Sequence, residues 1–419
     1  MRRPLPAFLL LIALAVPAAA APSGSSSGAA PADLVLGESR PLESGLGNPA
    51  LAGAREEWLE LISGAHSTLD LEEFYFSHRP GEALQPVVDA IGRAAARGVH
   101  VRLLLDAGFL KTYPQPAESL AHLPSVELRA IDYHKLAGGV QHAKFMIADG
   151  ADSWIGSQNL DWRSLTQIHE LGIRVRHAAV SAAIEAVFAS DWAAADTSKP
   201  FAPGAPVATT WPQHAIQGAG RAVDVWLGAS PRATTPAGIP WDRDLIVARL
   251  DGAKHDVTVQ ALQYGVGRRA GADSTLHRAL VAAAARGVKV RLIVSDWTLG
   301  GSNEPALHDL AARGVEVRIS RVPEWSGGYI PFARVEHCKF MTVDGEWLWI
   351  GTSNWEPSYF LNTRNLGLTI HDPVLAMQAL ATFDTSWNAP TAAPYGPDTQ
   401  LPPRAHDMKA PAGMKVYGE

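Results

Sequence analysis

The sequence repeats itself once, and this duplication limits the chain to folds built from two similar units. Three segments recur in the same order: Gly64–Tyr75, Ala96–Asp106 and Val126–Arg129 in the first half, and Gly252–Tyr264, Ala285–Ser295 and Val315–Arg318 in the second. Each copy is long enough to bury its own core and too long to be a solenoid repeat. Two similar lobes packed about a pseudo-two-fold axis are therefore the simplest architecture.

The pattern within each copy is that of an α/β fold. An alanine-rich helix ends at Gly98 in the first copy and at Gly287 in the second, and apolar, β-branched residues follow each glycine. Glycine in this position closes the last helical turn in the left-handed conformation, and the residues after it suit a buried strand. The sequence thus predicts two α/β lobes.

The composition of the chain suggests where the lobes begin and end. We expect the lobes to span residues 34–198 and 218–388, joined by a Pro-rich linker over 199–217. Beyond them, residues 389–419 form a Pro- and Ala-rich tail with little apolar surface. Such a tail either wraps the surface or is disordered, and we assign it no function.

The N-terminus has the features of a secretory signal. Two arginines precede an apolar run, Phe8–Val16, which is too short to span a membrane and is followed by small residues. We expect a signal peptide over 1–20, cleaved after Ala20, and a flexible leader over 21–33. Because Cys338 is the only cysteine, neither a lipid-modified N-terminal cysteine nor an intramolecular disulfide is possible. The sequence predicts a secreted or periplasmic protein.

The net charge argues against broad electrostatic capture of nucleic acid. The chain carries −6 at pH 7, and loss of two arginines with the signal peptide changes this to −8. Proteins that bind nucleic acid over an extended surface are usually basic. Binding of nucleic acid would therefore require a local basic channel.

Each copy ends in a motif that combines an imidazole with an ammonium group. The motif residues are His142, Lys144, Asp149, Ser157 and Asn159 in the first copy, and His337, Lys339, Asp344, Ser353 and Asn354 in the second. The hydroxyl groups of Ser157 and Ser353 and the amides of the two asparagines are expected to bind the same anionic substrate. A histidine and a lysine two residues apart on a strand point to the same face, as a shared anionic ligand requires. One such motif could arise by chance, but two at equivalent places in a duplication predict a single site made from both halves.

The doubled His-x-Lys-x4-Asp motif, with its Gly-Ser-x-Asn turn, resembles the signature of the phospholipase D superfamily. The resemblance covers nearly all of residues 34–388, although the second turn reads Gly-Thr-Ser-Asn. A narrower likeness, carried by Gly156–Gln167, Glu170–Gly172 and Ile330–Val335, is to the lysosomal phospholipase D branch of 5′-exonucleases on single-stranded nucleic acid. The resemblance implies two phospholipase D-type lobes and a phosphodiesterase with a covalent phosphohistidine intermediate.

In the superfamily that the chain resembles, one histidine attacks phosphorus and the other protonates the leaving oxygen. We expect His142 to be the nucleophile, because Glu170 lies where the family places a carboxylate that orients the imidazole. Asn365 takes the equivalent position in the second copy, which makes His337 the better general acid and base. One imidazole must start neutral and the other charged, so the sequence predicts a bell-shaped pH dependence.

Other polar residues of the motifs are expected to support the site. Lys144 and Lys339 would stabilise the charge on the equatorial phosphate oxygens. Asp149 and Asp344 lie on the opposite side of their strand from the lysine, where capping of a turn is an equally good interpretation. The chemistry requires no metal or other cofactor, and the sequence contains no cluster of metal-ligating residues.

Two substrates remain open, because both would use the same motifs. For the first, a single-stranded nucleic acid entered from its end, the candidate base-stacking residues are Tyr75, Trp162, Trp355 and Tyr359, and the candidate phosphate-binding residues are Arg163 and Arg334. The second is a phospholipid head group, which a phospholipase D or a cardiolipin synthase-like phosphatidyltransferase would release to water or transfer to an alcohol.

The local likeness to the exonucleases favours nucleic acid over phospholipid. An inactive binding scaffold is a third interpretation, and the completeness of both motifs argues against it. Because both half-sites belong to one chain, we expect a monomer to be sufficient for catalysis, with no obligate protein partner.

Overall fold

The computed structural model describes residues 32–267, 273–404, 407 and 409–418. The expected signal peptide, and the leader up to residue 31, lie outside the described residues. Within the described ranges, no helix is both long and apolar enough to cross a membrane.

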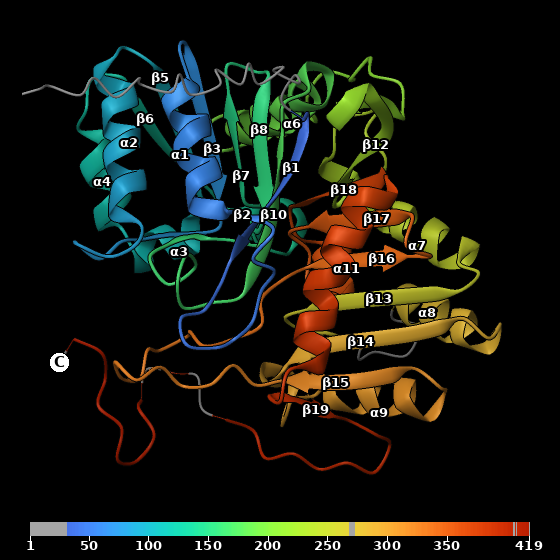
Figure 1. Ribbon diagram of the computed structural model, residues 1–419. Helices are drawn as coiled ribbons and strands as arrows, with labels where there is room; N and C mark the ends of the chain where they lie inside the picture. Colours follow the sequence, from blue (N-terminus) through green and yellow to red (C-terminus); the bar gives the residue numbers. More distant parts are fainter. Residues whose placement is uncertain (1–31, 268–272, 405–406, 408, 419) are drawn as a thin grey trace, which may run out of the picture.

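The first lobe is built on an eight-stranded mixed sheet (Figure 1). In spatial order its strands are β2 (Ala52–Gly53), β1 (Leu34–Ser39), β10 (Glu170–Val175), β8 (Asp152–Gly156), β7 (Phe145–Ala148), β3 (Thr68–Glu73), β5 (His100–Asp106) and β6 (Val126–Ile131). Strands β3, β5 and β6 are parallel, whereas β7, β8 and β10 pair antiparallel. A separate small sheet pairs β4 (Phe76–Ser77) with β9 (Leu160–Asp161).

The second lobe repeats this order of strands in a nine-stranded sheet. Its strands are β11 (Gln213–Gln217), β12 (Arg221–Ser230), β18 (Asn365–His371), β17 (Trp347–Gly351), β16 (Phe340–Val343), β13 (Asp256–Ala261), β14 (Lys289–Ser295), β15 (Glu316–Ser320) and β19 (Ala392–Pro394). The sequence of strands β12, β18, β17, β16, β13, β14 and β15 corresponds position by position to β1, β10, β8, β7, β3, β5 and β6 of the first lobe. The prediction of two similar α/β lobes is confirmed.

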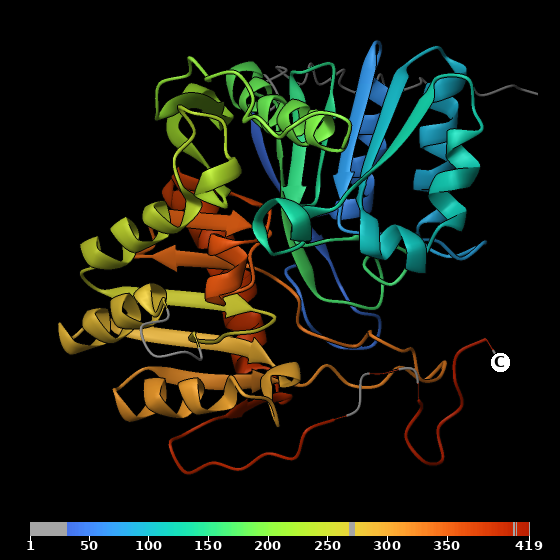
Figure 2. The ribbon, with the colours of Figure 1, turned by 180° about the vertical axis from the view of Figure 1, so that it is seen from behind.

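Helices cover both faces of each sheet. They are α1 (Ala54–Gly64), α2 (Gln85–Ala96), α3 (Ala107–Thr112), α4 (Gln115–Ala121), α5 (Tyr133–Ala137) and α6 (Ala178–Ala194) in the first lobe, and α7 (Asp242–Gly252), α8 (Thr275–Ala285), α9 (Glu304–Ala312), α10 (Pro357–Leu361) and α11 (Pro373–Asn388) in the second. Figure 1 shows α11 in front of the second sheet, and Figure 2 shows α7, α8 and α9 on its other face.

Three hydrophobic cores follow from this layering. One core lies under α1, α2 and α4, and a second lies under α7, α8 and α9. A third contains residues of α6 and α11 together with strands of both lobes, including Ile173 and Ile350. The lobes therefore share a continuous apolar core, which fixes the two halves of any site at their interface relative to each other.

The glycines after the repeated helices behave as predicted. Gly98 has φ +91° and Gly287 has φ +88°, and the next residue, Val99 or Val288, donates its amide hydrogen back into the last turn of the helix. This arrangement satisfies carbonyl groups that the helix end would leave without partners. Each chain then enters the buried central strand, β5 or β14.

The linker and the tail contain more structure than their composition suggested. Strand β11 lies within the expected linker and pairs with β12, so the second sheet begins before residue 218. In the tail, β19 pairs with β15, and Tyr329 bridges to Val416. Figure 1 shows the tail running beneath both lobes, so its described residues wrap the surface. Pairing along the edge of a sheet satisfies the hydrogen-bonding groups of the backbone. Composition alone does not reveal such pairing.

Candidate active site

The two motifs meet in a pocket of about 550 Å³ between the lobes. The pocket lies where β3 and β5 end and β7 begins, and His142 and His337 both line it with only 4% and 8% of their surface exposed. The residues around it are Phe74, Tyr75, Phe109, Thr112, Tyr113, His142, Asn159, Arg163, Ile168, Leu262, Gln263, Trp297, Phe332, Val335, His337, Asn354 and Tyr359.

Each imidazole faces a side chain of the other lobe. Nδ1 of His337 lies 2.6 Å from Oε1 of Glu170, and Nδ1 of His142 lies 3.0 Å from Oδ1 of Asn365. The expected pairing of Glu170 with His142 is therefore wrong. Glu170 orients His337, and the residue that orients His142 is Asn365.

The exchange of partners follows from short parallel bridges between the lobes. Gln141 bridges to Arg364, and His169 bridges to Glu336. The amide of His142 donates to the carbonyl oxygen of Arg364 at 3.0 Å, and the amide of His337 donates to that of His169 at 2.9 Å. The residues that follow each bridge therefore lie side by side across the interface. They are His142 and Asn365 after one bridge, and His337 and Glu170 after the other.

Both lysines are completely buried beside the imidazoles. Nζ of Lys144 donates to the backbone oxygen of His142 at 2.5 Å, and Nζ of Lys339 donates to that of His337 at 2.8 Å. Burial, and next the Lys339 ammonium, lower the pKa of Lys144 well below its usual range. Burial lowers the pKa of Lys339 to about 7, against the opposing effect of Glu170. Because both amino groups are buried, a bound anion beside them would stabilise their charged forms.

The imidazoles are neutral in the free site at pH 7. Burial, followed by the charges of the two lysines, lowers the pKa of His142 and of His337 well below the usual value. Burial also raises the pKa of Glu170, while Lys339 opposes that rise. A bound phosphodiester brings a negative charge next to these groups and so favours protonation of the imidazoles.

The glycine turns after the motifs contribute one amide each. Asn159 and Asn354 line the pocket. Ser157 instead exchanges hydrogen bonds with the backbone of β10, and its counterpart by structure is Thr352, whose hydroxyl donates to Oδ1 of Asn365 at 2.8 Å. Ser353 is buried outside the pocket lining. The turns therefore place asparagines at the pocket and use their hydroxyls to support the strands that carry the partners of the histidines.

Three of the six aromatic and arginine side chains predicted to bind substrate line the pocket. Tyr75 donates to Asp161 at 2.8 Å, and Arg163 forms an ion pair with the same carboxylate at 2.9 Å. The ring of Tyr359 stands edge-on to that of His142, with 4.9 Å between their centroids. Since Asp161 already neutralises Arg163, this arginine is a weaker phosphate ligand than the sequence suggested.

The other three candidates lie outside the pocket lining. Trp355 is 1% exposed and packs edge-on against Trp349 in the core of the second lobe. Arg334 is also 1% exposed, and its guanidinium donates to Pro323, Gln167 and Leu42. Trp162 packs near Tyr417 of the tail. Their expected contacts with substrate are corrected, because internal partners already occupy these side chains.

Asp149 and Asp344 lie at the far ends of their strands, away from the pocket. Asp149 accepts backbone hydrogen bonds from residues 66–68 at 2.7 to 2.9 Å, and Asp344 accepts them from residues 254–256. Both carboxylates thus cap the turn that leads into the central strand of their lobe. They support the fold and do not contact the reacting groups.

The structure adds residues that the sequence did not single out. Phe74, Phe109 and Tyr113 extend the aromatic wall of the pocket, and the carboxylate of Glu73 is buried near Lys144. Glu73 is the last residue of β3 and Phe74 follows it, and Phe109 lies shortly after the end of β5. Carboxyl ends of parallel strands gather at one edge of a sheet, and this rule could have found them.

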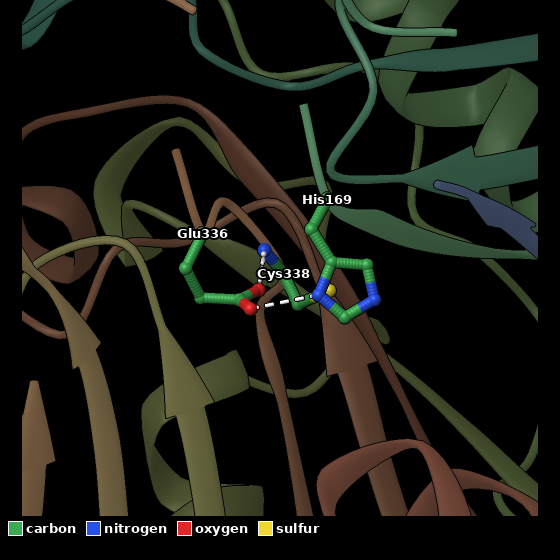
Figure 3. Close-up of side chains that lie close together, drawn as sticks. All are labelled: His169, Glu336 and Cys338. Atoms are coloured by element: carbon green, nitrogen blue, oxygen red, sulfur yellow. Dashed lines mark hydrogen bonds and ion pairs between the residues drawn. The ribbon is translucent and has the colours of Figure 1, made fainter. Parts of the chain in front are cut away.

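One group among the described residues has the composition of a metal site. Ligand atoms of His169, Glu336 and Cys338 all lie within 4.8 Å of one another. Figure 3 shows the three side chains close together. Both imidazole nitrogens, however, already face carboxylate oxygens, of Glu336 at 2.7 Å and of Glu38 at 3.0 Å. Burial raises the pKa of the Cys338 thiol, which disfavours the thiolate that a metal requires. The arrangement fits an ion-paired cluster better than a metal site.

Comparison with known proteins agrees with the motifs and the fold. The family model described as "Cardiolipin synthase, PLD-like domain" matches residues 58–192 and 246–387. Phospholipase D Z of Dictyostelium discoideum is 30% identical over 363 residues, which cover 81% of this chain and 86% of that protein. The 5′-3′ exonuclease PLD3 of Rattus norvegicus is 31% identical over 411 residues, which cover 86% and 80%.

A solved structure shows the same fold at lower identity. The phosphatidylserine synthase of Haemophilus influenzae Rd KW20 superposes with a TM-score of 0.57 at 14% identity, over 81% of this chain and 85% of that one. Two α/β lobes that bring paired imidazoles into one pocket, with a buried lysine beside each, are typical of a phosphodiesterase of this family. The chain belongs to the phospholipase D superfamily, and within it the chain is similar to the PLD3 and PLD4 exonucleases.

Proposed function

We propose that this phosphodiesterase degrades single-stranded nucleic acid from its 5′ end, without a metal, through a phosphohistidine. The observation that carries the proposal is an aromatic wall continuous with His142. The ring centroid of Phe74 lies 4.9 Å from that of His142 and 4.1 Å from that of Phe109, and Tyr75 lies 5.5 Å from Tyr113. Aromatic rings stack on any base, so such a wall suits a substrate of varied sequence. Relatives named as 5′-3′ exonucleases support this choice.

The proposed reaction has two displacements at phosphorus. Nε2 of His142 attacks the phosphodiester, and the bond to the leaving oxygen breaks as His337 donates a proton to that oxygen. Water then attacks the phosphohistidine, gives its proton to His337 and releases His142. The ammonium groups of Lys144 and Lys339 stabilise the charge on the equatorial oxygens in both steps.

The partners of the imidazoles support this division of roles, on different grounds from those expected. The amide of Asn365 donates to two backbone oxygens, so its own oxygen accepts the Nδ1 proton of His142 and leaves a lone pair on Nε2. The carboxylate of Glu170 stabilises a positive charge on His337. When a phosphodiester binds, the proton therefore goes to His337 and the nucleophile stays neutral.

Cleavage of a phospholipid is the second candidate. Ile168, Leu262 and Phe332 give the opposite side of the pocket an apolar character that suits a lipid as well as a base. A relative named phospholipase D matches over similar lengths. The four reacting groups would be the same, and only the leaving group would differ.

The test compares the two substrates in the presence of a chelator. The purified chain is incubated with 5′-hydroxyl single-stranded DNA and, separately, with phosphatidylcholine vesicles. His142→Ala is the inactive control, and His214→Ala, whose side chain is 68% exposed on β11, is the matched surface control. Stepwise nucleotide release that only His142→Ala abolishes supports the proposal. Choline release with intact DNA contradicts it and favours the phospholipase.

A further inference from the structure

A row of alternating charges runs from the surface to the backbone beside His337. Nε of Arg40 lies 2.8 Å from Glu38, Nε2 of His169 lies 3.0 Å from the other oxygen of Glu38, and Nδ1 of His169 lies 2.7 Å from Glu336. The side chains of Glu38, His169 and Glu336 have no exposed surface, whereas that of Arg40 is 36% exposed. With an imidazolium at its centre the row is neutral overall, which is how buried charges are tolerated.

The protonation of His169 follows from its neighbours. A carboxylate oxygen can only accept a hydrogen bond, and each ring nitrogen of His169 faces one, so both nitrogens carry protons. Burial by itself would lower the pKa of His169, but the Glu336 carboxylate opposes this effect and raises the pKa. The same contact keeps the pKa of Glu336 below its usual range, despite its burial.

This row joins the lobes directly behind the catalytic imidazole. The amide of His169 donates to the carbonyl oxygen of Val335 at 3.1 Å, and the amide of His337 donates to that of His169 at 2.9 Å. Oε1 of Glu336 accepts from the amide of Cys338 at 3.2 Å. The residues before and after His337 are thereby fixed to the strand that continues into Glu170. Figure 3 shows the ring of His169 directed at Glu336, with Cys338 beside it.

The other half-site has a corresponding ion pair made of different residues. Arg364 takes the place of His169, and its amide donates to the carbonyl oxygen of Val140 at 3.0 Å. Its guanidinium forms two hydrogen bonds with Asp191 of α6, at 2.5 and 2.9 Å, and neither side chain is exposed. A buried ion pair thus crosses the interface immediately before each partner of an imidazole. An ion pair occurs at this position in both half-sites although its side chains differ. This recurrence indicates that the ion pair serves to hold the partner of the imidazole.

We infer that Glu38, His169 and Glu336 form a positioning unit that holds Glu170 against Nδ1 of His337. The unit touches no substrate. It fixes the distance between carboxylate and imidazole and directs Nε2 of His337 toward the leaving oxygen. This inference rests on the proposed function in one respect, the role of His337 as the general acid.

The experiment compares two leaving groups in the same variants. Release of p-nitrophenol from bis(p-nitrophenyl) phosphate needs little help from an acid, whereas release of a nucleoside oxygen depends on one. In Glu336→Gln we expect kcat on single-stranded DNA to fall at least about tenfold with KM unchanged, because displaced catalytic groups lose rate and not affinity. The first-turnover burst of p-nitrophenol should be unchanged, because it depends on His142.

Two further variants separate positioning from stability. In Glu336→Gln the buried imidazolium of His169 loses one of its two carboxylate partners, which could destabilise the fold. The double variant His169→Gln/Glu336→Gln removes both charges and replaces them with two neutral amides. This double variant should show the same selective loss. The matched control is His277→Gln, because His277 also engages both ring nitrogens, with Tyr264 and Asp309, but lies outside the pocket lining. It should lower the melting temperature without selective loss.

The outcomes distinguish failure of the inference from failure of the proposed function. An equal loss of DNA cleavage and of the burst, or a rise in KM alone, would overturn the positioning role. If the wild type cleaves no phosphodiester, the proposed function fails, and nitrogen NMR of labelled histidines still tests the inference. The Nδ1 signal of His337 should then shift in Glu336→Gln while that of His142 stays; an unshifted His337 signal contradicts the inference.

Discussion

The half-sites of His142 and His337 have the same backbone frame and different neighbours. Each histidine lies three residues before a short antiparallel strand and has a lysine two residues later, and the partner of its imidazole comes from the other lobe across a parallel bridge. The partner is the amide of Asn365 for His142 and the carboxylate of Glu170 for His337. The ion pair behind the partner contains Arg364 in one case and His169 in the other.

In the proposed mechanism, this difference explains how a duplicated site divides two roles. A symmetric site would treat the imidazoles alike, but the proposed reaction needs one neutral and one charged group. The single carboxylate supplies the asymmetry by favouring a proton on His337. A second asymmetry lies in the aromatic rings of the pocket, of which Phe74, Tyr75, Phe109 and Tyr113 come from the first lobe and Trp297, Phe332 and Tyr359 from the second. The predictions below test how far these asymmetries determine the chemistry.

The largest expected effect is the loss of either imidazole. On single-stranded DNA both His142→Ala and His337→Ala should lower kcat by about a thousandfold or more, as loss of a nucleophile or of a general acid does. On bis(p-nitrophenyl) phosphate, His337→Ala should keep the burst of one equivalent of p-nitrophenol, and His142→Ala should lose it. A burst retained only in His142→Ala would exchange the two roles.

Exchange of the partners should have a smaller effect. Glu170→Gln removes the charge that favours the imidazolium of His337, and kcat on DNA should fall about 10- to 100-fold. Asn365→Asp instead places a charge beside His142, favours its protonation and lowers the rate of the burst. The double variant Glu170→Gln/Asn365→Asp places the carboxylate beside His142 and the amide beside His337, which is the reverse of the natural arrangement. If Glu170→Gln has no effect on kcat, the carboxylate does not determine the roles.

The pH dependence of kcat/KM should reflect the titration of the buried histidines and lysines. Because burial and the lysines lower the pKa of both imidazoles, the proton that His337 donates is lost from the free enzyme as the pH rises. Lys339, with a pKa of about 7, loses its charge over the same range. The profile of kcat/KM should therefore have its maximum below pH 6.5 and fall as the pH rises through 7. A maximum above pH 8 would contradict this account.

The aromatic wall should affect binding more than chemistry. Tyr113→Ala removes a ring that stacks on a base, and KM for single-stranded DNA should rise about tenfold with kcat little changed. Trp355→Ala, by contrast, opens the core of the second lobe and should lower the free energy of unfolding by about 3 kcal/mol or more. An unchanged KM in Tyr113→Ala would remove stacking from the proposal and favour the lipid substrate.

The smallest effects are expected where the two lobes remain alike. Asp149→Asn and Asp344→Asn each weaken the capping of one turn and should lower the free energy of unfolding by about 1 kcal/mol. The two losses should be similar, because the contacts are equivalent. Activity measured well below the melting temperature should be unchanged. A large loss of kcat in one variant only would show that the equivalence is incomplete.

Features with a local cause could be predicted from the sequence. The glycines that end the helices and the doubled motif depend on residues that are near one another in the chain. Exposure was harder to predict, because Trp355 and Arg334 are buried by segments distant in sequence. The edge strand β11 was missed for the same reason, since its pattern becomes visible only beside β12.

The sequence by itself determined that two α/β lobes bring one imidazole and one lysine each to a common site. The duplication and the identical spacing of the two His-x-Lys motifs predict this whatever the details of packing, although each motif lies just before its strand and not on it. Only the tertiary structure decided which partner belongs to which imidazole. Because the lobes face each other about a pseudo-two-fold axis, a residue that follows a motif along the chain ends up beside the motif of the other lobe. Glu170 therefore serves His337, and order along the chain could not reveal it.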